Sequence, residues 1–271
     1  MNTPPTPTPA NQTTVTTRDR IATVTFDQIA RRNAMTLKMW NELASICAEL
    51  AAADLGDDDT EEPARVVIFT GAGTGAFVAG ADISQFTSVR PAGRGQDSYN
   101  ETVNGCYRAV ASLPQPTIAS IHGACVGGGV GIAVSADIRI AASDAKFGLP
   151  PARLGIGYPP DGVAALVHLI GPAWTKQLIY TADLIDADTA LRIGLVNEVV
   201  PPADLESRVG ELATTMIRRA PLSQRSAKVS VEAAYRSELL PEAQRWVERC
   251  ADSADYSEGV AAFLEKRSPK F

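Results

Sequence analysis

The chain has few of the residues that build metal centres and disulfide frameworks. Its 271 residues include two histidines, His122 and His168, and four scattered cysteines that form no CxxC pair. Structural zinc sites and disulfide scaffolds both draw on closely spaced cysteines or histidines. We therefore expect no metal site, reduced thiols and a cytoplasmic location.

An excess of positive charge and long apolar runs are also missing. Lys and Arg number 25 against 31 Asp and Glu, a formal net charge of −6. This balance argues against partners such as nucleic acid or an anionic membrane. No apolar run reaches the ~20 residues that span a bilayer. The opening MNTPPTPTPANQTT lacks the basic region and apolar core of a signal peptide.

The composition that remains, 45% hydrophobic and 21% charged, suits a folded α/β protein with a sizeable core. We predict a disordered Pro- and Thr-rich tail over 1–12, an α/β core over 13–200 and a helical part over 201–271. In the core we expect a hairpin at 13–26 and strands at 65–70, 117–123 and 137–142. The helices expected there are at 37–53, 97–112, 161–170, 173–181 and 186–193. The helical part is predicted to hold helices at 203–219, 221–236, 241–252 and a last one ending near 266.

Two glycine-rich segments follow predicted strands, 71-GAGTGAFVAGADI-83 and the run from Gly127 to Gly131. Neither has the GxGxxG spacing of a dinucleotide site or the GK[ST] ending of a phosphate-binding loop. One interpretation is an oxyanion hole, in which unpaired backbone N–H groups at a helix start converge on a developing negative oxygen. The alternative is that the glycines only allow tight packing of helix against strand.

Three segments together resemble the crotonase superfamily, the enoyl-CoA hydratases and isomerases. They are 77-FVAGADISQF-86, 122-HGACVGGGVGIAVSADIRIA-141 and 194-GLVNEVVP-201. The resemblance extends from about residue 13 to the ending 263-FLEKRSPKF-271. It implies an α/β fold, a crotonase-like spiral of ββα units with a C-terminal helical trimerisation region. It also implies assembly as a homotrimer or a dimer of trimers.

The resemblance also implies a site for an acyl-CoA substrate and no separate cofactor. The backbone N–H groups of Ala81 and Gly128 would hold the thioester carbonyl while an enolate forms at the α carbon. Arg31 stands at the usual basic position for CoA, and Phe263 and Lys266 resemble the pair that reaches a neighbouring subunit's CoA. The other expected substrate-binding residues lie on the two loops and the following segment: Ala79, Asp82, Ile83, Gly127 and Pro151.

The chain departs from the family pattern at two positions. Hydratases carry glutamates that position and activate water, and here Gly131 and Pro151 stand in their places. Neither residue can transfer a proton, so both acid/base groups are missing. The single-glutamate isomerases keep the second position, which puts their mechanism in doubt as well.

The segment 150-PPARLGIGYPPDGV-163 offers two replacements. Asp161 is the nearest carboxylate, although an Asp after Pro-Pro also suits a helix start. Tyr158 lies in a PAxLGxxY stretch similar to that of the methylmalonyl-CoA decarboxylase branch, where a tyrosine helps to orient the leaving carboxylate. That branch has a histidine at the position of Ala81 and a glutamate at that of Gly131, and Tyr158 could instead be a packing residue.

Three functions stay open. The first is an acyl-CoA enzyme of the enoyl-CoA hydratase/isomerase type that stabilises a thioester enolate without the two glutamates. The second is a decarboxylase of methylmalonyl-CoA-type thioesters, in which loss of CO2 creates the enolate. The third is a non-catalytic CoA-binding scaffold that has kept the fold.

Overall fold

The N-terminal hairpin forms one edge of a large sheet in the computed structural model, which describes residues 11–53, 63–89, 96–158 and 160–271. Strands β1 (Gln12–Arg18) and β2 (Ile21–Asp27) pair in antiparallel fashion, as predicted. Gln12 already belongs to the ladder, opposite Asp27, so the predicted tail over 1–12 is too long at its inner end. The rest of that prediction, residues 1–10, lies outside the described residues.

The described strands form two β-sheets, one of six strands and one of four. The large sheet has the order β1-β2-β3-β5-β7-β10, and every pair after the hairpin is parallel. Its later strands are β3 (Val66–Gly71), β5 (Thr117–Ile121), β7 (Ile138–Ala142) and β10 (Glu198–Val200). The small sheet has the order β4-β6-β8-β9, with β4 (Ala76–Val78), β6 (Ala124–Val126), β8 (Lys146–Gly148) and β9 (Ile185–Asp186).

The chain passes from the large sheet to the small sheet and then into helical structure three times. The turns are β3-β4, β5-β6 and β7-β8, and they lead to α3 (Gln96–Ala111), α4 (Gly128–Ser135) and α5 (Pro160–Thr181). This ββα order is the one that the resemblance implies. Because β4 and β6 pair in parallel, the loops that leave them meet at the same edge of the small sheet.

The helices over the large sheet begin and end where local signals favour it. Helix α1 (Leu37–Ala52) starts at Thr36, whose hydroxyl oxygen accepts a hydrogen bond from the N–H of Met39 at 3.2 Å. Helix α5 changes direction at Gly171, which has φ 72°, just before Pro172. That break separates the two helices predicted at 161–170 and 173–181. The short helices α2 (Phe86–Val89) and α6 (Ala187–Arg192) complete this part.

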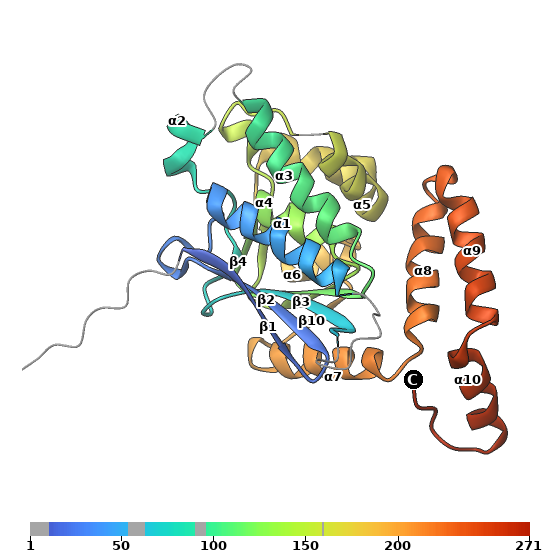
Figure 1. Ribbon diagram of the computed structural model, residues 1–271. Coiled ribbons are helices and arrows are strands. Elements are labelled where there is room, and N and C mark those ends of the chain that lie inside the picture. The colour runs from blue at the N-terminus through green and yellow to red at the C-terminus, as the bar shows by residue number, and fades with distance from the viewer. Residues whose placement is uncertain (1–10, 54–62, 90–95, 159) are drawn as a thin grey trace, which may run out of the picture.

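Strand β3 is buried on both faces, which explains its continuous apolar sequence. Val67 and Phe69 point into the main core together with α1, whereas Val66 and Ile68 pack against α7 (Leu205–Ile217). Figure 1 shows α1, α3 and α4 on one face of the sheet and α7 on the other. A strand enclosed in this way needs apolar side chains at every position.

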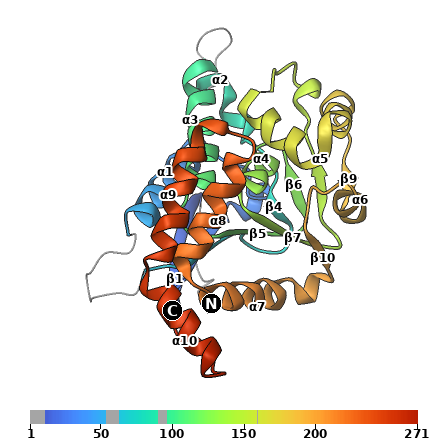
Figure 2. The same ribbon diagram turned by 90° about the vertical axis from the view of Figure 1, so that its right-hand side faces the viewer.

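The last three helices stand beside the core. They are α8 (Pro221–Ala233), α9 (Leu240–Ala251) and α10 (Ala254–Leu264), with α8 and α9 running as an antiparallel pair (Figures 1 and 2). Large apolar side chains remain exposed on all three, including Val231, Val247 and Phe263. Among the described residues, no helix has the length and apolar character required to cross a bilayer.

Candidate active site

The two glycine-rich loops lie against each other. A Cβ atom added at Gly127 would stand 3.7 Å from Cα of Gly80. Two residues further on, a Cβ at position 129 would lie 2.2 Å from the carbonyl oxygen of Val78, closer than real Cβ atoms approach. Glycine is therefore required at 129 for α4 to start directly against β4. Close packing is one reason for the glycines, and it brings Ala81 and Gly128 to the same edge.

Both loops present a backbone N–H group without a partner in the described part of the chain. Met35 pairs with the residues on either side of Ala81, since its N–H donates to the carbonyl of Gly80 at 2.7 Å and its carbonyl accepts from Asp82 at 2.8 Å. The N–H of Ala81 itself therefore points away from Met35, because successive groups of an extended backbone face opposite sides. Gly128 is the first residue of α4, where an N–H has no carbonyl one turn earlier.

A cavity of about 140 Å³ is bordered by both of these residues. It brings together seven of the residues predicted from the sequence: Ala79, Ala81, Ile83, Gly127, Gly128, Pro151 and Tyr158. They come from the two loops, from the 3-10 helices η2 (Ile83–Gln85) and η4 (Pro151–Arg153), and from the segment before α5. The site is thus assembled from the ends of β4 and β6 and the chain that follows β8.

The opposite wall of the cavity is formed by helices α1 and α3, none of whose residues was predicted from the sequence to belong to the site. Trp40 of α1 and Tyr99, Asn100, Val103 and Tyr107 of α3 line the cavity. Tyr99, Val103 and Tyr107 are four residues apart, which places them on one face of a helix. That spacing is the only signal in the sequence for this wall, because a buried stripe of this kind usually indicates ordinary packing.

The ring of Tyr107 fills the space beside Gly131. A Cβ at position 131 would lie 2.2 Å from Cζ and 2.4 Å from Oη of Tyr107. The rings of Trp40 and Tyr107 pack in a T-shaped arrangement, with ring centroids 5.8 Å apart and an interplanar angle of 84°. The place where the resemblance expects a glutamate side chain is therefore occupied by an aromatic ring from another helix.

The described lining contains no Asp, Glu, His, Lys, Arg or Cys. Its titratable groups are the hydroxyls of Tyr99, Tyr107 and Tyr158. Burial, and then the neighbouring Tyr158, raise the pKa of Tyr107 well above its ordinary value, and burial likewise raises the pKa of Tyr158. Both phenols are neutral hydrogen-bond donors at neutral pH. The hydroxyl of Tyr158 is buried and has no hydrogen-bond partner among the residues that the structure describes.

Arg31 and Asp82 are joined to each other beside the cavity. Nη1 of Arg31 donates to Oδ1 of Asp82 at 3.0 Å and to Oγ of Ser84 at 2.8 Å. Burial opposes ionisation of Asp82, but hydrogen bonds from Ser84 and the charge of Arg31 outweigh it and lower the pKa. Arg31 remains 55% exposed, so its guanidinium is accessible to a phosphate while it holds the loop. Contact of Arg31 or Asp82 with CoA stays a prediction.

Asn33 fixes the same loop from within and was not singled out from the sequence. Its Nδ2 donates to the carbonyls of Ala72 at 2.9 Å and Ala76 at 2.7 Å, and its Oδ1 accepts from the N–H of Gln28. These bonds attach the 3-10 helix η1 (Ile29–Arg31) to the turn between β3 and β4. An isolated Asn in a polar loop carries no sequence signal that would have marked it.

Besides Arg31 and Asp82, three predicted site residues are not among those that line the cavity. Asp161 lies in the first turn of α5, and its side chain is outside the described residues. Phe263, 83% exposed, and Lys266 lie at the end of α10. Both were assigned to a neighbouring subunit's CoA, and that assignment stays a prediction. No group of three or more His, Cys, Asp or Glu in the described chain is arranged to hold a metal ion.

Comparison with known proteins assigns the chain to a family. A model of the family described as enoyl-CoA hydratase/isomerase matches residues 16–271. The chain belongs to the enoyl-CoA hydratase/isomerase family. It is 36% identical to the short-chain-enoyl-CoA hydratase of Clostridium acetobutylicum, over 92% of each chain. It is also 36% identical to the crotonyl-CoA hydratase of Syntrophomonas wolfei, over 82% of this chain and 84% of that one.

Solved structures support the same assignment. The enoyl-CoA hydratase from Bacillus anthracis superposes with a TM-score of 0.84 at 31% identity, over 97% of this chain and 99% of that chain. The α/β fold expected from the resemblance is thus confirmed as that of the enoyl-CoA hydratase/isomerase family, and the chain is an acyl-CoA enzyme of this family. The relatives are named as hydratases, whereas the described lining of this member's cavity has no carboxylate.

Proposed function

We propose that this enzyme binds an acyl-CoA thioester and stabilises its enolate with the backbone N–H groups of Ala81 and Gly128. The observation that carries the proposal is that both groups border one cavity and have no partner in the described chain. The thioester oxygen would accept both hydrogen bonds. Because negative charge grows on that oxygen as the enolate forms, the two bonds strengthen most in the transition state.

The lining favours reactions that do not need a carboxylate base at the α carbon. In hydration, a group must remove a proton from water and another must deliver one to the α carbon. Neutral phenols with raised pKa values are weak bases, and the positions of the two hydratase glutamates hold Gly131 and Pro151. Asp161 is the one carboxylate of the neighbouring segment that stays a candidate for this work.

Decarboxylation of a malonyl-type thioester is the second candidate, and the unpartnered hydroxyl of Tyr158 favours it. In that reaction the bond between the α carbon and the carboxylate carbon breaks, and its electron pair passes into the thioester enolate. CO2 leaves, and the α carbon then takes a proton from water. Tyr158 would donate a hydrogen bond that orients the carboxylate across the C–C bond to be broken, within a mainly apolar cavity.

The test follows three substrates by NMR in D2O. Methylmalonyl-CoA is expected to give propionyl-CoA with deuterium at the α carbon, butyryl-CoA to show slow exchange of its α protons, and crotonyl-CoA to hydrate far more slowly than with a two-glutamate hydratase. Hydration of crotonyl-CoA at the rate of such a hydratase would contradict the importance of the missing glutamates. Binding of butyryl-CoA without turnover of any of the three would favour the scaffold.

Two substitutions at Gly128 test the oxyanion hole itself. Proline is tolerated at the first position of a helix and has no N–H, whereas alanine keeps the N–H and adds the same Cβ. A Cβ at this position would meet Cζ2 of Trp40 at 2.9 Å in either variant. We expect Gly128→Pro to lower kcat a further ~100- to 1000-fold below Gly128→Ala. Equal rates in the two folded variants would remove Gly128 from the hole.

A further inference from the structure

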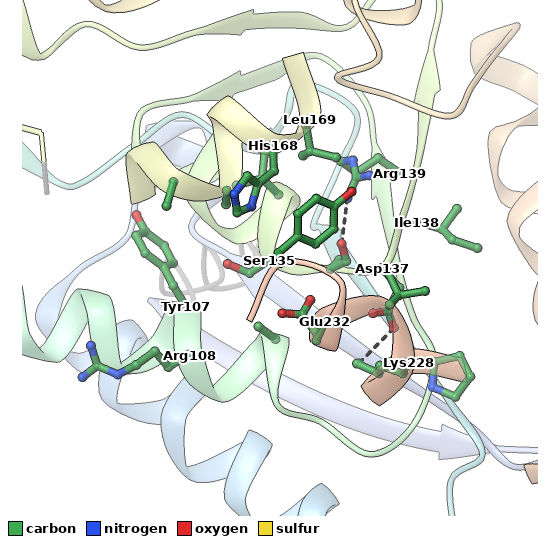
Figure 3. Close-up of a pocket in the computed structure, with 18 of the residues that line it drawn as sticks. Tyr107, Arg108, Ser135, Asp137, Ile138, Arg139, His168, Leu169, Lys228 and Glu232 are labelled. Carbon is green, nitrogen blue, oxygen red and sulfur yellow. Dashed lines mark hydrogen bonds and ion pairs between the residues drawn. The ribbon is translucent and has the colours of Figure 1, made fainter. Parts of the chain in front are cut away.

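Tyr107 separates the candidate active site from a second, larger cavity. That cavity has a volume of about 710 Å³ and lies between the core and α8. Tyr107 is the only described residue that lines both cavities. Figure 3 shows Tyr107 on one side of the larger cavity, with Asp137 and Lys228 on the other. The tyrosine ring therefore forms a partition between the smaller and the larger cavity.

The partition is held firmly. Trp40 packs on one side of the Tyr107 ring, and Gly131 of α4 lies against its hydroxyl end, where even a methyl group would overlap it. The phenol oxygen also lies 3.5 Å from the carbonyl oxygen of Gly128. An aromatic ring confined between two helices cannot swing aside without disturbing close packing.

The small cavity suits a short acyl group. Its volume of about 140 Å³ is about one fifth of that of the larger cavity. A ten-carbon acyl chain is longer than a butyryl group by six carbons and needs correspondingly more space. The larger cavity offers that space directly behind Tyr107, where Gly131, Val134 and Ala165 line it. Charged side chains also border it. Lys228 and Asp137 pair with each other at 3.0 Å, and the guanidinium of Arg139 donates to the carbonyls of Leu195 and Ala136. The remaining Arg, His and Glu residues of its described lining are Arg108, His168, Glu232 and Arg236.

We propose that Tyr107 is a specificity-determining residue that ends the acyl site and restricts this enzyme to short-chain acyl-CoA thioesters. The proposal rests on the proposed function, since it assumes that the acyl group enters the cavity beside Ala81 and Gly128. It adds the substrate class and assigns it to one side chain. Removal of the ring joins the two cavities and admits a longer chain.

The experiment measures the binding of free CoA, butyryl-CoA and decanoyl-CoA by isothermal titration calorimetry. The wild-type enzyme is expected to bind butyryl-CoA at least about tenfold more tightly than decanoyl-CoA. Tyr107→Phe keeps the ring and is expected to keep this ratio. Tyr107→Ala is expected to tighten the binding of decanoyl-CoA at least about tenfold relative to that of butyryl-CoA. The binding of free CoA is expected to stay unchanged. Tyr107→Leu, a smaller loss of core volume, serves if the alanine variant does not fold.

The possible results separate this inference from the proposed function. If the wild type binds butyryl-CoA but binds decanoyl-CoA equally well, or if neither shortened side chain changes the ratio, the role of Tyr107 is refuted while acyl-CoA binding stands. If the wild type binds neither free CoA nor butyryl-CoA, the proposed function fails and the inference fails with it. A ratio altered by Tyr107→Phe would assign the selectivity to the hydroxyl and overturn the partition.

Discussion

At the scale of single residues, Gly131 and Tyr107 have to be understood together. A glycine at position 131 looks, in the sequence alone, like the simple loss of a glutamate. In the structure it is the condition for a phenol ring to lie against α4, because any Cβ at that position overlaps the ring. The space in which the resemblance expects a glutamate side chain is thus taken by an aromatic ring from another helix.

This pairing predicts the outcome of Gly131→Ala. Alanine in place of a helical glycine normally stabilises by up to ~1 kcal/mol. Here the added Cβ would lie 2.2 Å from Cζ of Tyr107, and such overpacking costs about 1–3 kcal/mol. We expect a net loss of stability, measured by urea denaturation. Tyr107→Leu in the same chain is expected to recover most of the loss, so the two changes should be strongly non-additive.

Two results of this double-mutant cycle would contradict the pairing of Gly131 with Tyr107. If Gly131→Ala stabilises the enzyme, or if its effect adds to that of Tyr107→Leu, the two residues do not compete for one space. Gly210 on the exposed side of α7 is a matched control, since nothing lies within 4 Å of a Cβ there. Alanine at that position should show only the gain in helix propensity.

Of these two residues, the sequence alone could mark Gly131 but not Tyr107. The resemblance marked Gly131 and Pro151 as the positions where a glutamate is expected, by their place in the motifs alone. Tyr107 lies 24 residues earlier, on a helix whose contact with α4 depends on the tertiary fold. Its spacing from Tyr99 and Val103 predicts a buried face, but spacing cannot say that the face borders a cavity.

At the scale of elements, two short 3-10 helices hold the mouth of the site through one carboxylate. Oδ1 of Asp82 accepts hydrogen bonds from Arg31 at the end of η1, at 3.0 Å, and from the N–H and hydroxyl of Ser84 in η2, at 3.1 Å and 2.6 Å. Ala81 lies directly before Asp82, so the same bonds fix the direction of its N–H. Local hydrogen bonding, more than apolar packing, sets this part of the proposed oxyanion hole.

Asp82→Asn tests that clamp through its pH dependence. The folded-state pKa of Asp82 is lower than its ordinary value of 3.8, so the ionised form stabilises the folded state. This stabilisation is complete above the ordinary value and is lost as the pH falls through the lower folded-state value. We expect the wild type to exceed Asp82→Asn in unfolding free energy by about 1–3 kcal/mol at neutral pH. The difference should stay constant down to about pH 5 and shrink below pH 3.8.

Urea denaturation of both proteins across this range gives the measurement. If the difference in unfolding free energy between wild type and Asp82→Asn grows as the pH falls, the carboxylate destabilises the fold. The clamp would then be contradicted.

Elements differed in how well the sequence predicted them. Helix α1 and the hairpin were found within a residue or two, because capping, periodicity and a polar turn agree there. The small sheet was not predicted. Strands such as β4 and β6 have three residues each, too few for a period of two to be recognised. They form because a neighbouring strand lies parallel to them, which is information from the tertiary structure.

At the scale of the whole molecule, the C-terminal helices carry apolar side chains that the single chain does not cover. Tyr235 and Leu240 near the α8–α9 connection, Val247 in α9, and Phe263 and Leu264 at the end of α10 are all at least half exposed. A monomeric protein rarely leaves so many large apolar groups on three successive helices. The helical trimerisation region implied by the resemblance would explain them, because neighbouring subunits would cover this face.

We therefore predict that Phe263→Asp combined with Leu264→Asp dissociates the assembly. The two side chains are 83% and 73% exposed in the single chain, so carboxylates there have little effect on an isolated subunit. Between subunits the same charges would be buried without partners, which costs several kcal/mol. Sedimentation velocity should show a trimer or hexamer for the wild type and mainly monomer for the double variant. Leu191→Asp on α6, a substitution of an exposed leucine away from these helices, should leave the assembly intact. A wild type that sediments as a monomer would refute the assembly, and the predicted contribution of Phe263 and Lys266 to a neighbouring CoA site would be refuted with it.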